Sequence, residues 1–103
     1  MISAIEERIE AIKSLCAKYQ VKRLELFGSA ADNTFQPGRS DIDFLVEFLP
    51  DADMGPWMSH YSEFREEMES ALGSKVDLVS ATALKNPYLI SEINRTRSLL
   101  YAA

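Results

Sequence analysis

The chain has 103 residues, of which 47% are hydrophobic and 26% are charged, a composition typical of folded globular proteins and not of disordered ones. This length is that of one ordinary domain, so we expect residues 1–103 to form a single domain with no room for a second, substrate-binding one. The net charge of −5 argues against a broad surface for nucleic acids or anionic membranes, which would need a basic patch.

The cysteine content and the N-terminus indicate the compartment. Cys16 is the only cysteine, which excludes an internal disulfide and fits a reducing environment. It falls on the apolar side of a predicted helix, so we expect a core residue and not a nucleophile. Acidic residues occur too early for a signal peptide, and no apolar run approaches transmembrane length. The sequence therefore predicts a cytoplasmic protein.

The first third of the chain contains one predicted helix and one predicted strand. Apolar residues recur at helical spacing from Ile2 to Tyr19, and Ser3 followed by Glu6 resembles a capping box, so a helix is expected from about Ser3 to Tyr19. In segment 21–27, apolar and polar residues alternate at Leu24 and Leu26 as in a short strand, and Gly28 ends the segment. Residues 29–33 are expected to form a turn of helix, followed by a loop up to residue 40.

The remaining elements alternate between strand and helix. Segment 42–48 is a predicted strand, residues 57–72 form an amphipathic helix that ends at Gly73, and KVDLVS is a third strand. Asn86–Arg95 is a last helix, and SLLYA is either a closing edge strand or a helix tail. This order predicts an α+β (α/β) fold in which helices cover a small β-sheet. The apolar stripe of the long helix is expected to be core: Trp57, Tyr61, Phe64, Met68 and Leu72.

Two carboxylates stand at the start of the second strand. Period-two alternation places Asp41 and Asp43 on one face, with Cα atoms about 6–7 Å apart. Two ionised carboxylates at that distance repel by roughly 2–3 kcal/mol at an effective dielectric near 20, and burial strengthens the repulsion unless a cation lies between them. Mg²⁺ suits such a pair because it binds one or two carboxylates together with substrate phosphates. A solvated strand end, in which Asp41 caps the loop, explains these residues equally well.

A Gly-Ser pair follows the preceding strand. Glycine allows a ligand to approach the backbone closely, and the first N–H groups of a helix, with the Ser29 hydroxyl, can hold phosphate oxygens. Such a pair ends many strands, so Gly28 and Ser29 alone are a weak signal. Consecutive strands commonly neighbour each other, however, so phosphates at Gly28 and Ser29 would reach a metal at the aspartates.

Asp77 is a third candidate. It lies between apolar residues in KVDLV and faces away from Val76 and Leu78. It would help hold a catalytic metal and accept the proton of an attacking hydroxyl. The alternative is an exposed residue paired with Lys75 or Arg23. The only histidine, His60, has no acidic or cysteine cluster around it and is assigned no role. Arg95 and Arg97 are interpreted as surface charges by default, with contact to a nucleotide or an acidic partner as the alternative.

The combination of FGSAADNTFQPGRSDIDFLV with GSKVDLVS resembles the polymerase-beta-type nucleotidyltransferase superfamily, and the short chain resembles its minimal (MNT-domain) members. That pattern is a Gly-Ser pair, a spacer, an Asp-hydrophobic-Asp doublet and a later aspartate on a strand. The resemblance extends over essentially the whole chain. It implies the nucleotidyltransferase fold, a small mixed β-sheet flanked by helices, with residues 1–103 as a single minimal domain.

The resemblance also implies roles. Asp41, Asp43 and Asp77 would be catalytic and bind two Mg²⁺ ions, and Gly28 and Ser29 would bind the ATP phosphates. Two departures from the family pattern affect triphosphate binding. Family members commonly follow Gly-Ser with a basic residue and a further glycine, where this chain has Ala30, Ala31, Asp32 and Asn33, and the spacer from Ala30 to Ser40 is slightly long at eleven residues. Arg39 is a candidate source of the missing positive charge, although an ordinary exposed arginine is the simpler interpretation.

Minimal members of this family include MntA-like antitoxins, which transfer AMP from ATP to a tyrosine of a HEPN-domain (HepT-like) toxin. The resemblance therefore implies a protein adenylyltransferase whose partners are ATP and a cognate HEPN-domain toxin, with no membrane and no direct nucleic-acid binding. Two alternatives remain open: an antitoxin that neutralises its toxin by binding alone, and a nucleotidyltransferase that modifies a small molecule.

Overall fold

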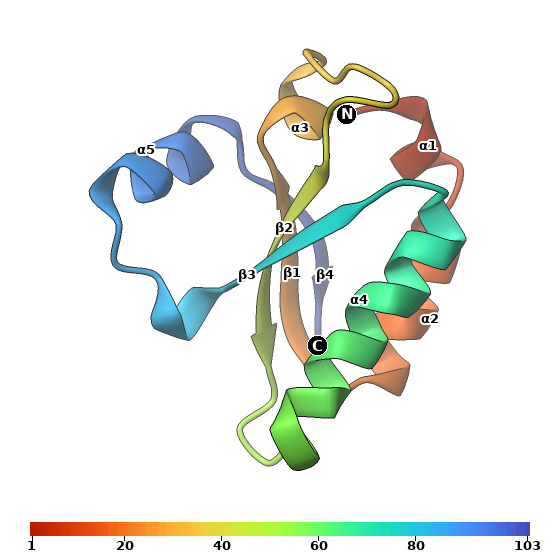
Figure 1. Cartoon of the computed structure of the whole chain (residues 1–103), viewed down its shortest axis with the longest axis vertical. Helices are drawn as coiled ribbons and strands as arrows, with labels where there is room; N and C mark the ends of the chain where they lie inside the picture. The colour runs from red at the N-terminus through yellow and green to blue at the C-terminus, as the bar shows by residue number, and fades with distance from the viewer.

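The computed structural model describes residues 1–103 and has the expected alternation of helices and strands (Figure 1). The elements in chain order are α1 (Ser3–Glu6), α2 (Ile9–Lys18), β1 (Val21–Phe27), α3 (Ser29–Asp32), β2 (Ile42–Phe48), the 3₁₀ turn η1 (Pro56–Met58), α4 (Ser59–Leu72), β3 (Val76–Ser80), the 3₁₀ turn η2 (Ala81–Ala83), α5 (Pro87–Thr96) and β4 (Ser98–Ala102). The predicted α+β class is confirmed, and SLLYA is a strand.

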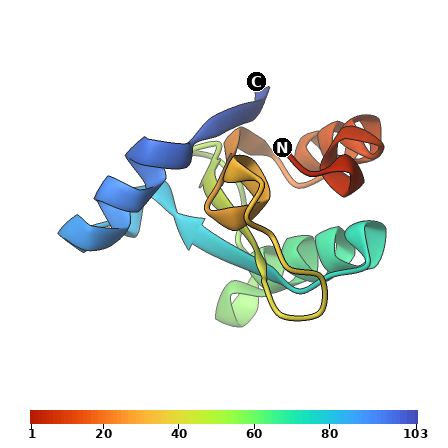
Figure 2. The same ribbon diagram turned by 90° about the horizontal axis from the view of Figure 1, so that it is seen from above.

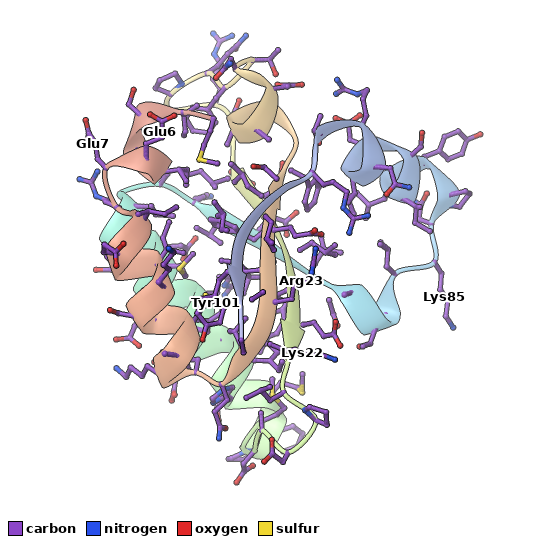
Figure 3. The ribbon with its side chains drawn as sticks, turned by 180° about the vertical axis from the view of Figure 1, so that it is seen from behind. Glu6, Glu7, Lys22, Arg23, Lys85 and Tyr101 are labelled. Carbon is purple, nitrogen blue, oxygen red and sulfur yellow. The ribbon has the colours of Figure 1, made fainter.

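The four strands form one mixed sheet in the order β3-β2-β1-β4. β1 pairs antiparallel with β2 and with β4, whereas β2 and β3 run parallel. The parallel pair requires a crossover, which α4 provides. Seen from behind, Lys22 and Arg23 lie near Tyr101 of the edge strand (Figure 3), as expected because Leu24 pairs with Tyr101.

The helices lie unevenly on the two sheet faces. α1, α2 and α4 cover one face, and α5 alone lies over the other, as both views show (Figures 1 and 2). The main core of 17 buried residues includes Leu24, Leu26, Ile42 and Phe44 of the sheet, and Cys16 is fully buried within it. A smaller cluster of Phe27, Leu45 and Ile93 lies under α5. One sheet face is thus filled by core, while part of the other is free for polar side chains.

The N-terminal helix differs from its prediction. A single helix from Ser3 to Tyr19 was expected, but it breaks between α1 and α2, where Arg8 has non-helical angles of φ −119° and ψ 19°. The predicted capping box is also wrong, because Ile2 occupies the N-cap and no side chain caps the helix. Tertiary contact explains the break: the Ile2 N–H donates to the Ala30 carbonyl at 3.0 Å, which docks α1 on α3.

The start of α4 gives a second correction. Trp57 was expected in the core, but its exposed fraction is 99%. Gly55 and Pro56 begin a turn in which Trp57 has a positive φ of 55°, so α4 starts only at Ser59 and its apolar stripe does not extend back to Trp57. Phe64, Met68 and Leu72 are buried as predicted, and Gly73 ends the helix with φ +66°. No helix has the length and apolarity needed to cross a lipid bilayer.

These observations predict that truncation of two aromatic residues has very different effects on stability. Phe64 is fully buried and packs against Tyr19 and Phe48 at centroid distances of 5.5 and 5.9 Å. We expect Phe64→Ala to lower the free energy of unfolding by about 3–5 kcal/mol because it leaves a cavity. Trp57→Ala should change it by less than about 0.5 kcal/mol, since the side chain contacts solvent. Urea unfolding of both variants checks this, and equal losses would contradict the assignment of the core.

Candidate active site

The acidic residues meet on the face of the sheet opposite the main core. The parallel register places Asp43 of β2 directly beside Asp77 of β3, on strands about 4.8 Å apart. Their neighbours Ile42, Phe44 and Val76 belong to the core on the other face. The predicted alternation is therefore confirmed. Asp77 is exposed and forms no salt bridge with Lys75 or Arg23, so the alternative of a paired surface residue is not observed.

Asp41 lies one residue before β2 and is exposed. The Ile42 N–H donates to the Lys75 carbonyl at 2.9 Å, which continues the parallel ladder to this end of the strand. Asp41 is thus held near Asp43 and beside the entry to β3. The doublet and the third aspartate, far apart in sequence, lie at one end of the β2–β3 pair.

The surroundings of Asp43 disfavour its charged form. Burial is the largest cause and raises the pKa of Asp43 from 3.8 to about 6, with further contributions from the negative charges of Asp77, Asp41 and Glu92. A half-buried carboxylate near three others is costly to ionise. A bound cation would remove that cost, because it would neutralise the charges that raise the pKa.

The Gly-Ser turn packs directly against this carboxylate. Phe27 pairs with Asp43 in the β1–β2 register, and Gly28 follows with φ +74° and ψ −151°. A Cβ atom on Gly28 would lie 2.5 Å from Asp43 Oδ2, so a side chain at position 28 would displace the Asp43 carboxylate. The positive φ of Gly28 favours glycine at this position, and its lack of a side chain leaves the carboxylate where it is. Ser29, half-buried, is the first residue of α3.

Helix α5 supplies contacts that the sequence patterns did not indicate. The Gly28 N–H donates to Thr96 Oγ1 at 2.8 Å, and the Thr96 hydroxyl donates to the Glu92 carbonyl at 2.9 Å. Arg95 bridges α5 to α3, with Nη2 lying 2.6 Å from Glu92 Oε1 and 3.2 Å from Asp32 Oδ2. Two links thus fasten the last turn of α5 to the Gly-Ser turn.

Glu25, on the same sheet face, is the one buried charged residue, with an exposed fraction of 3%. It accepts hydrogen bonds from Arg97 at 2.6 Å and from Arg23 at 3.0 Å. Burial raises its pKa, but the two guanidinium groups outweigh burial and hold the pKa below its ordinary value. Arg97 is exposed, as expected of a surface charge, but it also ties the start of β4 to the sheet through its ion pair with Glu25.

The donor set fits a hard divalent cation. No cluster of three or more histidine, cysteine or acidic side chains is arranged to enclose a metal ion on its own. The site instead offers the carboxylates of Asp43 and Asp77 side by side, and the Asp43 carboxylate lies close to the Gly-Ser turn. Mg²⁺ is commonly bound in this way, by one or two carboxylates with the remaining positions left to water and substrate phosphates.

Comparison with known proteins identifies the family. The sequence pattern described as the nucleotidyltransferase domain matches residues 8–100. The chain belongs to the nucleotidyltransferase domain family. A relative from Methanocaldococcus jannaschii, MJ1379, provisionally named a protein adenylyltransferase, is 41% identical over 93 residues that span 89% of this chain and 90% of the relative. Protein adenylyltransferase MntA of Thermococcus cleftensis is 33% identical over 85 residues, 78% of this chain and 81% of MntA.

Solved structures of nucleotidyltransferases share the fold. One, provisionally described as a minimal nucleotidyltransferase, superposes with a TM-score of 0.71 at 31% identity and covers 91% of this chain and 90% of its own. Another, a crystal structure of a toxin–antitoxin with AMP-PNP, gives a TM-score of 0.69 at 26% identity and covers 92% of this chain and 73% of its own. The predicted nucleotidyltransferase fold is confirmed.

The crowding of negative charge around Asp43 predicts that, in EDTA, the difference in stability between Asp43→Asn and the wild type depends on pH. The Asp43 pKa is 3.8 in the unfolded chain and about 6 in the folded one, so the folded state bears a penalty that grows as pH rises from 3.8 to about 6 and is fully present above that. After allowance for solvent screening, Asp43→Asn should raise the free energy of unfolding at pH 8 by about 1 kcal/mol. The gain should shrink as pH falls from 6 and vanish well below pH 3.8, where the carboxyl is protonated in both states.

Thermal unfolding at several pH values measures this difference, with the exposed loop residue Asp51 changed to Asn as the control. If Asp43→Asn gained the same stability at every pH, or lost stability at pH 8, the inference that negative charges crowd Asp43 would be contradicted.

The hydrogen bond from Gly28 to Thr96 predicts a second effect. Thr96→Val keeps the shape of the side chain but removes the acceptor, so it should lower the free energy of unfolding by about 1–2 kcal/mol. Thr96→Ser retains the hydroxyl, so its free energy of unfolding should fall by less. Urea unfolding compares the two variants, and a Val variant as stable as the Ser variant would show that this contact contributes nothing.

Proposed function

We propose that this protein is an MntA-like protein adenylyltransferase that transfers AMP from ATP to a tyrosine of a cognate HEPN-domain toxin and thereby acts as its antitoxin. The observation that carries the proposal is the register of Asp43 beside Asp77, with Gly28 packed against Asp43. The named relatives, and the toxin–antitoxin structure with AMP-PNP, support ATP as the substrate and a protein as the acceptor.

Roles follow from position in the site. Asp41 and Asp43 bind Mg²⁺, and Asp77 either shares this role or accepts a proton. Gly28 and Ser29 bind phosphate oxygens at the start of α3. Two Mg²⁺ ions held by these carboxylates would neutralise their charge and would supply the positive charge that polarises the reacting phosphate. This assignment is supported by the raised pKa of Asp43, which marks a place where positive charge is favourable.

The reaction is a displacement at the α-phosphorus of ATP. The acceptor hydroxyl oxygen forms the new bond to this phosphorus, while the bond between the α-phosphorus and the oxygen that bridges to the β-phosphorus breaks. Pyrophosphate leaves with that electron pair. The proton of the acceptor passes to the carboxylate of Asp77, which is exposed and therefore accessible to an incoming protein.

The acceptor in this proposal is a protein, as the names of the relatives indicate. We propose that residues 1–103 work as a single minimal nucleotidyltransferase domain, in a reducing compartment such as the cytoplasm. The sheet face that carries the aspartates is covered only in part, by α5 (Figures 1 and 2). A partner protein brings its own surface to complete the site, whereas an antibiotic or another small molecule does not.

A direct test measures the intact mass of the HEPN-domain protein encoded beside this one after incubation with the protein, ATP and Mg²⁺. We expect a gain of one or more AMP masses. Asp43→Asn should reduce transfer by about 10³-fold or more, since it removes an oxygen ligand of the catalytic metal, and chelation of Mg²⁺ should abolish transfer. Asp51→Asn, an exposed carboxylate outside the site, is the control and should be fully active.

Fully active Asp43→Asn protein would contradict the assigned mechanism. A stable complex that blocks the toxin without any mass gain would favour the antitoxin that acts by binding alone. Ala30 and Ala31, which stand where the family commonly has a basic residue, are the feature that favours this second function.

A further inference from the structure

A polar cavity opens beside the acidic site, between the loop that leads into β2 and the turn that leads into β3. It has a volume of about 370 Å³, and its walls are Gly38 to Asp41 and Gly73 to Lys75. No hydrophobic residue lines it. Both segments lie at the same end of the molecule, as two views show (Figures 1 and 2). A cavity of this kind suits a small, strongly hydrated ligand and not an aromatic base.

Two cations of the cavity lack carboxylate partners. Neither Arg39 nor Lys75 takes part in a salt bridge, and both are exposed. The one carboxylate in the wall is Asp41, which lies beyond salt-bridge distance of both. In a chain with a net charge of −5, two unpaired cations that share one cavity make a local site for an anion.

The cavity adjoins the acidic site at Asp41, although Asp43 and Asp77 do not line it. Asp41 belongs to both, and the Ile42 N–H donates to the Lys75 carbonyl at 2.9 Å. This hydrogen bond extends the parallel ladder, so Lys75 stands two residues before Asp77 along the same extended segment and shares its face. A ligand that fills the cavity would therefore contact Asp41, the first of the three aspartates.

The hydroxyl of Ser40 adds a donor. Ser40 Oγ accepts the Gln36 N–H at 3.0 Å and has no other partner, so its hydroxyl hydrogen is free to donate. Phosphate oxygens are acceptors only, and they take hydrogen bonds from arginine, lysine and hydroxyl groups together. The three side chains thus match a phosphate group in both charge and hydrogen-bonding pattern.

The Gly-Ser turn itself provides no cation. Ala30 is fully buried, and Arg95, which contacts α3, is already engaged by Asp32 and Glu92. We propose that Arg39 and Lys75, with Ser40, bind the β- and γ-phosphates of ATP and retain the negative charge of pyrophosphate as it leaves. This inference rests on the proposed nucleotidyl transfer and names the residues that replace the missing basic residue after Ser29.

The test is calorimetric titration of the purified protein with ATP, AMP and pyrophosphate in the presence of Mg²⁺. Loss of two charge-assisted contacts in Arg39→Ala/Lys75→Ala should weaken ATP and pyrophosphate binding by about tenfold or more. AMP lacks the two outer phosphates, so its affinity should not change. Both side chains are exposed, so the variant should melt at the wild-type temperature.

Lys13→Ala/Arg65→Ala is the matched control, because it removes the same charge from α2 and α4 on the opposite sheet face and should bind all three ligands like the wild type. Unchanged ATP binding by the Arg39/Lys75 variant, while the wild type still transfers AMP, would overturn this inference and leave the proposed function standing. An equal loss of AMP and ATP affinity would also overturn it. A wild-type protein that neither binds ATP nor transfers AMP would overturn both.

Discussion

The site depends on a carboxylate that the fold holds where its charge is unfavourable. Asp43 is half-buried, lies beside Asp77 across a parallel strand pair, and feels the charges of Asp41 and Glu92. Relaxation away from this position is prevented because Ile42 and Phe44 on either side are fully buried in the core. The free energy of the core therefore offsets the electrostatic cost of holding the Asp43 carboxylate among other negative charges.

The architecture leaves this site accessible. Three helices fill one face of the sheet, which is enough to stabilise the strands, and the other face needs only the small cluster under α5. α5 has a further role, since Thr96 and Arg95 fasten it to the Gly-Ser turn, and Arg97 is fastened to Glu25 directly after it. The turn that faces Asp43 is thereby fixed by contacts from the opposite end of the chain.

Local patterns in the sequence predict the components of the site, whereas long-range contacts decide how they are held. The alternation in strand 42–48 and the flanking apolar residues place Asp43 and Asp77 correctly, because side-chain period in a strand is a local property. The hydrogen bond from Gly28 to Thr96 joins residues 68 apart, and no spacing rule indicates it. The helix break at Arg8 and the exposed Trp57 likewise arise from docking and from a turn, which override apolar periodicity.

The most direct measurement of the central claim is the thermal stability of the protein with Mg²⁺, with ATP and with both together, in the wild type and in Asp43→Asn. If the carboxylates hold a metal that also contacts the nucleotide phosphates, the two ligands together should raise the melting temperature by more than the sum of their separate effects. Asp43→Asn should lose this surplus. An equal surplus in both proteins would contradict the account, because the metal and the nucleotide would then bind without Asp43.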